Sequence, residues 1–217
     1  VEGFALRLSG VLAVPILAVY ALYDPVAVPI FAASTAATYV VVGRIRDRTL
    51  WYGRSVLVAS SVPGAVGPFL AFLALDSLLG SLRVHGGVLF VSSVLPGVAA
   101  YNHHQLDDDR ERLLDVGASL GVLAGLVALG WWLVGAAGGW LGTLAPPILL
   151  EQSAWVASVQ GIGVETATRA VVVPHVAATG VLLGGLLVTE AVYRRWGVRL
   201  VGLVAAPLLA LFALRNA

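Results

Sequence analysis

Long runs of apolar residues constrain this chain more than any other feature. A helix needs roughly 20 apolar residues to cross the hydrocarbon core of a bilayer. About seven segments approach this length, and they lie at 5–22, 26–43, 55–75, 85–102, 114–135, 170–191 and 199–214. Only 12% of the 217 residues are charged, against about 25% in a typical soluble domain. The sequence therefore predicts an all-α membrane helical bundle, with residues 1–217 forming a single integral membrane domain in the lipid bilayer.

The arginines indicate the orientation of these segments. If the segments alternate in direction, ten of the 13 basic residues fall on one side: Arg7, Arg44, Arg46, Arg48, Arg54, Arg110, Arg112, Arg194, Arg195 and Arg199. The other side receives Arg83, Arg169 and Arg215. Cytoplasmic loops carry the excess of Lys and Arg, so we expect a multi-pass protein of the cell membrane with its N-terminus in the cytoplasm. Residues 135–169 then form an outer interfacial or re-entrant stretch, with an eighth, poorly hydrophobic span as the alternative.

Prolines interrupt several segments, and one pair of segments repeats. Residues 7–22 align with residues 199–214 at a constant offset of 192, with Arg, Gly and Pro in register. We therefore expect residues 190–217 to begin a second copy of the first unit. Repeats built around Pro-interrupted helices are typical of transporters, although small residues after a proline also let helices pack closely. Both interpretations stay open.

The most prominent interruption is Pro96-Gly97, near the middle of the fourth segment. Proline removes an amide donor and disturbs the helix that precedes it, and in lipid the freed carbonyls need partners from protein or water. The first and fourth segments run in opposite directions, so their interruptions can meet at mid-membrane depth. We predict a shared seam that has outer-side arginines at its mouth and consists of Pro15, Ala18, Pro96, Gly97, Ala99, Arg83 and Arg169.

Composition excludes several classes of chemistry. Without cysteine there is no disulfide, thiolate metal site or cysteine nucleophile. Without lysine there is neither a P-loop nor a Schiff base for PLP. His103, His104 and Asp107 invite a metal site, and an intramembrane metal enzyme is one functional class to weigh. The adjacent histidines point apart, however, and no third histidine is spaced to complete the site. We expect no catalytic residue, no cofactor, no metal and no nucleic-acid partner.

Three stretches, in order along the chain, resemble the membrane subunit of poly-γ-glutamate synthase, the PgsC/CapC family. They are Gly10-Val-Leu-Ala-Val-Pro15, Thr38-Tyr39 followed by Thr49-Leu-Trp-Tyr-Gly-Arg54, and Val94-Leu-Pro-Gly-Val-Ala-Ala-Tyr-Asn102. The resemblance covers roughly residues 1–130. Ile16 stands where the family has a glycine and Ser55 where it has a second arginine, and Asn102 falls one place late. These departures concern the subtype within the family more than membership of the family.

The resemblance implies a non-catalytic role in capsule formation. Its partners would be a cytoplasmic ATP-dependent ligase, other synthase subunits and the anionic polyglutamate chain. The protein would anchor the ligase and assist synthesis and export of the polymer. Cytoplasmic arginines suit a partner or a polymer because a guanidinium binds carboxylates in a bidentate manner. The predicted binding face comprises Arg44, Arg46, Arg48, Tyr52, Gly53 and Arg54. A stand-alone secondary transporter or channel-like protein is the alternative function.

Overall fold

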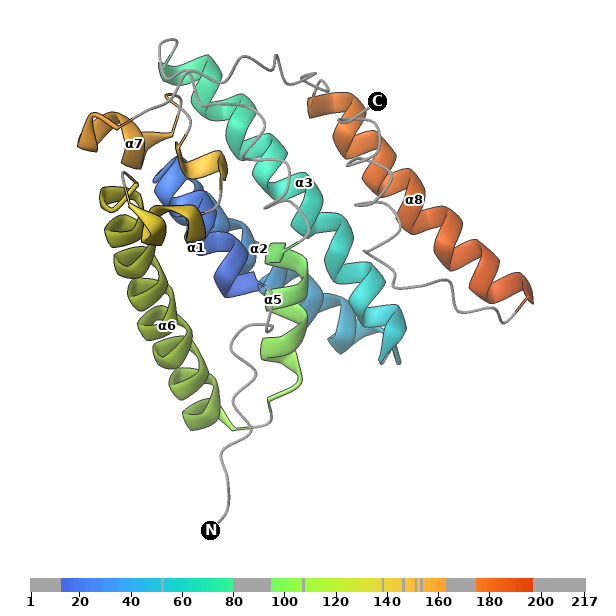
Figure 1. The fold of residues 1–217 in the computed structure, drawn as a ribbon. Coiled ribbons are helices and arrows are strands. Elements are labelled where there is room, and N and C mark those ends of the chain that lie inside the picture. Colours follow the sequence, from blue (N-terminus) through green and yellow to red (C-terminus); the bar gives the residue numbers. More distant parts are fainter. Residues whose placement is uncertain are drawn as a thin grey trace.

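A computed structural model describes residues 13–51, 53–79, 95–106, 108–137, 139–145, 147–150, 152, 154–162 and 175–196. Over these residues the regular structure is helical, without a β-strand, which confirms the predicted all-α class there. The helices are α1 (Ala13–Tyr23), α2 (Ala27–Arg48), α3 (Arg54–Leu79), α5 (Leu95–His104), α6 (Asp109–Gly135), η1 (Trp140–Leu144), η2 (Pro147–Leu150), α7 (Trp155–Gln160) and α8 (His175–Trp196). Figure 1 shows their arrangement, with α6 and α8 on opposite flanks.

Two of these helices, α2 and α6, are long and apolar enough to cross a membrane. Both coincide with predicted spans, at 26–43 and 114–135. The count of about seven spans is not confirmed: α1 has 11 residues and the described α5 has 10, short of the roughly 20 that a span needs. The predicted span and repeat copy at 199–214 lie outside the described residues.

Both candidate spans expose most of their apolar residues. In the most apolar 18-residue window of each helix, 22% of α2 and 17% of α6 is buried. The exposed side chains include Val40 and Val41 on α2 and Leu120 and Leu129 on α6. A core helix of a soluble protein buries such residues, whereas a helix that is apolar all round suits lipid. The surface of the bundle therefore favours membrane association.

The helices form two groups. Contacts are more extensive within each group than between the two groups. In the three-helix group, α2, α3 and α5 pack on one another, and α3 also contacts α8. In the two-helix group, α1 packs along α6, and the short helices η1, η2 and α7 cover the ends of both. Figure 1 shows these short helices at the top of α1 and α6. They are referred to below as the cap.

The three-helix group is held together by close backbone approach. A Cβ built on Gly97 would lie 2.5 Å from the carbonyl oxygen of Ser60, and one built on Gly64 would lie 2.5 Å from the amide nitrogen of Gly97. Each glycine follows a proline, Pro63 or Pro96. Helix α3 continues through Pro63 without interruption. Helices α3 and α5 thus cross where only a hydrogen atom fits, as is common between membrane helices.

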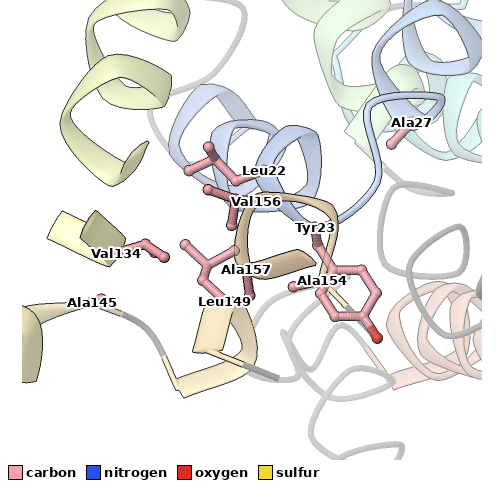
Figure 2. Close-up of a cluster of buried hydrophobic side chains, with 9 residues drawn as sticks. All are labelled: Leu22, Tyr23, Ala27, Val134, Ala145, Leu149, Ala154, Val156 and Ala157. Atoms are coloured by element: carbon pink, nitrogen blue, oxygen red, sulfur yellow. The ribbon is translucent and has the colours of Figure 1, made fainter. Parts of the chain in front are cut away.

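The two-helix group and the cap share a cluster of buried apolar side chains. Figure 2 shows the cluster beneath the cap, and its buried members are Leu22, Tyr23, Ala27, Val134, Ala145, Leu149, Ala154, Val156 and Ala157. Gly130 makes room for Leu22, because a Cβ at position 130 would overlap Cδ1 of that leucine. The described helices between residues 135 and 162 have at most six residues, so none of them is long enough to be the alternative eighth span.

Candidate functional site

Arginines of the described helices gather at one end of the bundle. They occur in the last turns of α2 and α8 and at the start of α3 and α6, at Arg46, Arg48, Arg54, Arg110, Arg112, Arg194 and Arg195. In Figure 1 these four helix ends all lie toward the bottom of the view, away from the cap. This side of the molecule is referred to below as the basic end.

At the basic end, Tyr39 and His104 join α2 to α5. Their rings stack with centroids 4.1 Å apart and planes at 8°. The His104 Nε2 atom donates to the carbonyl oxygen of Tyr39 at 2.9 Å, and because a carbonyl only accepts, Nε2 carries the hydrogen. Arg46 donates from Nη1 to the carbonyl oxygen of His104 at 2.9 Å. The last carbonyls of a helix lack intrahelical partners, so Arg46 caps α5.

His103 and Arg112 join α5 to α6. The His103 Nδ1 atom lies 3.9 Å from Oδ2 of Asp115, a carboxylate that is 1% exposed. Arg112 donates from Nε and Nη2 to the carbonyl oxygen of Leu106 at 3.0 and 2.7 Å, and from Nη1 to Oδ1 of Asp109 at 2.6 Å. These bonds fix the turn between the two helices. The contacts of this paragraph and the previous one are referred to together as the junction.

The junction favours neutral histidines. Burial is the main cause that lowers the pKa of His103, while Asp115 opposes that shift and Arg112 adds to it. Burial also lowers the pKa of His104, against the hydrogen bond to the Tyr39 carbonyl, and Arg46 lowers it further. Since an imidazole is ordinarily half protonated near pH 6.5, both rings are uncharged at neutral pH.

A cavity of about 560 Å³ lies between the two helix groups. Its walls come from α1, α2, α5 and α6 and are mostly apolar, with Leu17, Phe31 and Leu120 among the lining side chains. His103 and Arg112 of the junction also line it. The cavity is therefore almost wholly apolar, with His103 and Arg112 lining its basic end.

The structure describes every residue of the predicted binding face except Tyr52. Arg44, Arg46 and Arg48 are exposed on the last turns of α2. Gly53 follows in a turn with φ +57°, a value that favours glycine, and Arg54 begins α3. Tyr52 lies outside the described residues. Binding of a partner or polymer by these residues stays a prediction.

The predicted seam is only partly assembled among the described residues. Pro96, Gly97 and Ala99 are buried on α5, and Ala18 is buried on α1, whereas Pro15 is exposed. Gly97 lies against Ser60 and Ser61 of α3, so the break in the fourth segment faces Pro63-Gly64. The sequence signal for this contact was the Pro-Gly pair that occurs in both segments. Arg83 and Arg169 lie outside the described residues, and a polymer path along the seam stays a prediction.

The residues considered for metal binding point to different partners. His104 faces Tyr39 and His103 faces Asp115, while Asp107 lies outside the described residues. Over the part of the chain that the structure describes, no group of three His, Cys, Asp or Glu residues is arranged to hold a metal. Sequence reasoning missed Asp115, although a carboxylate within the apolar segment 114–135 was a visible signal.

Comparison with known proteins identifies one family. A family model described as capsule biosynthesis CapC matches residues 1–112, which confirms the predicted PgsC/CapC resemblance. The matched residues include α1, α2, α3, α5 and the first residues of α6, and thus the junction apart from Asp115. No curated protein and no solved structure matches the chain.

Proposed function

Because the chain belongs to the CapC capsule biosynthesis family, we propose that it is the membrane subunit of a poly-γ-glutamate synthase. In this role it anchors the ATP-dependent ligase at the cytoplasmic side of the cell membrane. It also assists synthesis and export of the anionic polymer. Its own residues supply binding and positioning, while the ligase activates glutamate.

Exposed arginines on α2 carry this proposal. Arg44 and Arg48 are four residues apart and therefore share a helix face, and both are exposed. The Arg46 bond to the His104 carbonyl fixes this stretch against α5. A row of guanidinium groups on a rigid helix end fits carboxylates, either on an acidic ligase surface or on the nascent polymer. We assign the ligase contact to this row.

The arrangement of the helices supports the proposed membrane placement. Helices α2 and α6 run in opposite directions, and both expose apolar residues along their length. The arginine-bearing ends of α2, α3, α6 and α8 lie at one end of the bundle. The excess of positive charge marks the cytoplasmic side, so the basic end faces the cytoplasm and the cap faces outward.

A pull-down from mild detergent tests the proposal. Wild-type protein should copurify a cytoplasmic ATP-dependent ligase, identified by mass spectrometry. Replacing Arg44, Arg46 and Arg48 together with glutamine should abolish most of this association. The association that remains should be less sensitive to salt. Single replacements should change little, because exposed ion pairs contribute only about 0–1 kcal/mol each.

The control is the Arg194→Gln, Arg195→Gln double variant, which removes exposed arginines from the same end of the bundle but from α8. It should retain the ligase. Normal copurification by the triple variant would show that these arginines do not bind the ligase. A wild-type chain that purifies without any cytoplasmic protein would favour the stand-alone transporter.

A further inference from the structure

The cavity between the two helix groups has no role in the proposed function, yet it has the size of a binding site. Its volume of about 560 Å³ lies within the range of about 300–1,000 Å³ that is common for ligand sites. Val14 and Leu17 of α1 and Leu123 of α6 are among its apolar lining residues. Among the described lining residues, Arg112 is the one that carries a permanent charge.

The cavity is elongated along the helices. It runs along α2 from Val28 to Val40 and along α6 from Arg112 to Leu123. At 1.5 Å per residue, these stretches are about 18 and about 17 Å long. The hydrocarbon core of a bilayer is about 30 Å thick, so one leaflet is about 15 Å deep. The cavity is therefore about as long as one leaflet is deep. Arg112 lies at its basic end, while on α2 its lining reaches Val28 in the first turn of that helix.

Arg112, at the basic end of the cavity, can receive an anion. Within the described residues, three of the five N–H groups of Arg112 donate, to Leu106 and Asp109, so two remain there for a further acceptor. The Asp109 side chain in this ion pair is 93% exposed, and an exposed pair of this kind contributes little. A phosphate at this position would form charge-assisted hydrogen bonds with the guanidinium.

We propose that the cavity binds one acyl chain of an anionic phospholipid, whose phosphate is held by Arg112. The lipid comes from the leaflet that faces the basic end. Its chain fills the space between the two helix groups and contacts both. This site rests on the proposed membrane placement of α2 and α6 but not on the proposed ligase contact.

Two pairs of variants test the site. Ala36→Phe fills the cavity, because Ala36 lines it, whereas Ala37→Phe adds the same ring at a neighbouring exposed position that does not. Arg112→Gln removes the charge from the cavity, whereas Arg110→Gln removes an exposed charge outside it. The full chain is purified in mild detergent. It is then mixed with phosphatidylglycerol or phosphatidylcholine, and bound lipid is counted by native mass spectrometry.

Wild-type protein, Ala37→Phe and Arg110→Gln should each bind one phosphatidylglycerol and gain several degrees in melting temperature. Ala36→Phe should lose that lipid, and Arg112→Gln should bind it at least several-fold more weakly. Equal binding by Ala36→Phe and wild type would overturn the cavity as the site. Equal binding of both lipids by wild type would overturn the phosphate contact.

Further comparisons separate loss of the lipid site from misfolding, from binding of phosphate alone and from failure of the membrane placement. Ala36→Phe keeps every junction residue, so its result stands even if Arg112→Gln does not fold. Inorganic phosphate should not raise the melting temperature as the lipid does, and an equal rise would overturn the acyl-chain contact. Failure of the membrane placement would appear independently, as protein that stays in the aqueous fraction of a cell lysate. Loss of the ligase contact would not change lipid binding.

Discussion

The two helix groups solve the same packing problem by different means. In the two-helix group, large aliphatic side chains such as Leu22 fill the space beneath the cap. In the three-helix group, the backbones meet at Gly64 and Gly97, and the nearby Ser60 and Ser61 are fully buried. Burial of aliphatic surface stabilises a fold in contact with water. Small residues at helix crossings stabilise a fold in lipid, where aliphatic burial between helices gains little.

This difference matches the proposed placement in the membrane. In that placement the cap lies at the outer surface, where water is available to drive apolar side chains together. The crossing of α3 and α5 lies at Ser60 to Gly64 of α3 and at Gly97 of α5, where close backbone contact and satisfied hydroxyls hold the helices together. Ser60 and Ser61 both donate to the carbonyl oxygen of Leu57 at 2.8 Å. They are satisfied within their own helix and need no water.

The largest expected loss of stability is in the two-helix group. Leu22 is 2% exposed, and truncation of such a residue typically costs about 2–5 kcal/mol. Leu22→Ala should lower the free energy of unfolding by that amount in detergent, measured by thermal or chemical denaturation. Leu129→Ala on the exposed side of α6 is the control and should change little. Equal effects would mean that the cap does not form a core.

A smaller loss is expected at the crossing in the three-helix group. Alanine is the better helix former by up to about 1 kcal/mol, so Gly125→Ala on the open side of α6 should be neutral or stabilising. Gly97→Ala should instead destabilise by about 1–3 kcal/mol, because the new Cβ meets the backbone of Ser60. Melting temperatures of the two variants measure the difference. A higher melting temperature for both variants would mean that the α3–α5 crossing does not depend on close backbone approach, and the contrast between the groups would be lost.

The long helices could be predicted because apolar runs of membrane length leave few other structures available. Their ends were missed. Helix α2 continues to Arg48 and α6 begins at Asp109, each about five residues beyond the apolar segment. Long arginine side chains let a helix extend past the apolar region. Asp108 caps α6 by accepting from the amide of Arg110 at 3.1 Å. Hydrophobicity alone predicts neither the extension of α2 by arginines nor the capping of α6 by Asp108.

The site depended on contacts that no local pattern encodes. Arg46 was recognised as part of a basic face, but its bond to His104 joins residues 58 positions apart. Pro96 was paired with Pro15 because the two segments run in opposite directions. The third and fourth segments also run in opposite directions and are neighbours in the chain, which favours their contact. Direction alone could not select between Pro15 and Pro63.

The junction that links the two groups should respond to pH. The pKa values of His103 and His104 are lowered in the folded state, while the unfolded residues titrate near 6.5. The unfolded state therefore takes up protons first. Stability should be complete above about pH 6.5, should decline as the pH falls from there toward the folded pKa values, and should level off below them, measured as melting temperature. Replacing both histidines with glutamine should flatten this profile, and an unchanged slope would show that other groups cause it.

The smallest effect on stability is expected from cysteines placed at opposite ends. Arg48 and Gln152 are exposed, and surface substitutions usually change stability by less than about 0.5 kcal/mol. The chain has no native cysteine, so each variant reports one site. A membrane-impermeant maleimide on intact cells should label Gln152→Cys, and should label Arg48→Cys only after permeabilisation. The reverse pattern would invert the proposed orientation of the two ends.

The pairing of Tyr39 with His104 also fixes an order of events during synthesis. The two residues are 65 positions apart, and ribosomes add about 5–20 residues per second. Tyr39 is therefore made about 3–13 s before the ring that stacks on it. Helix α3 ends at Leu79, so the chain holds complete α2 and α3 without a complete α5 for about the last 1–5 s of that interval. A chain that ends before His104 lacks both the ring that stacks on Tyr39 and the carbonyl that accepts from Arg46, and so cannot join α5 to α2 through these contacts.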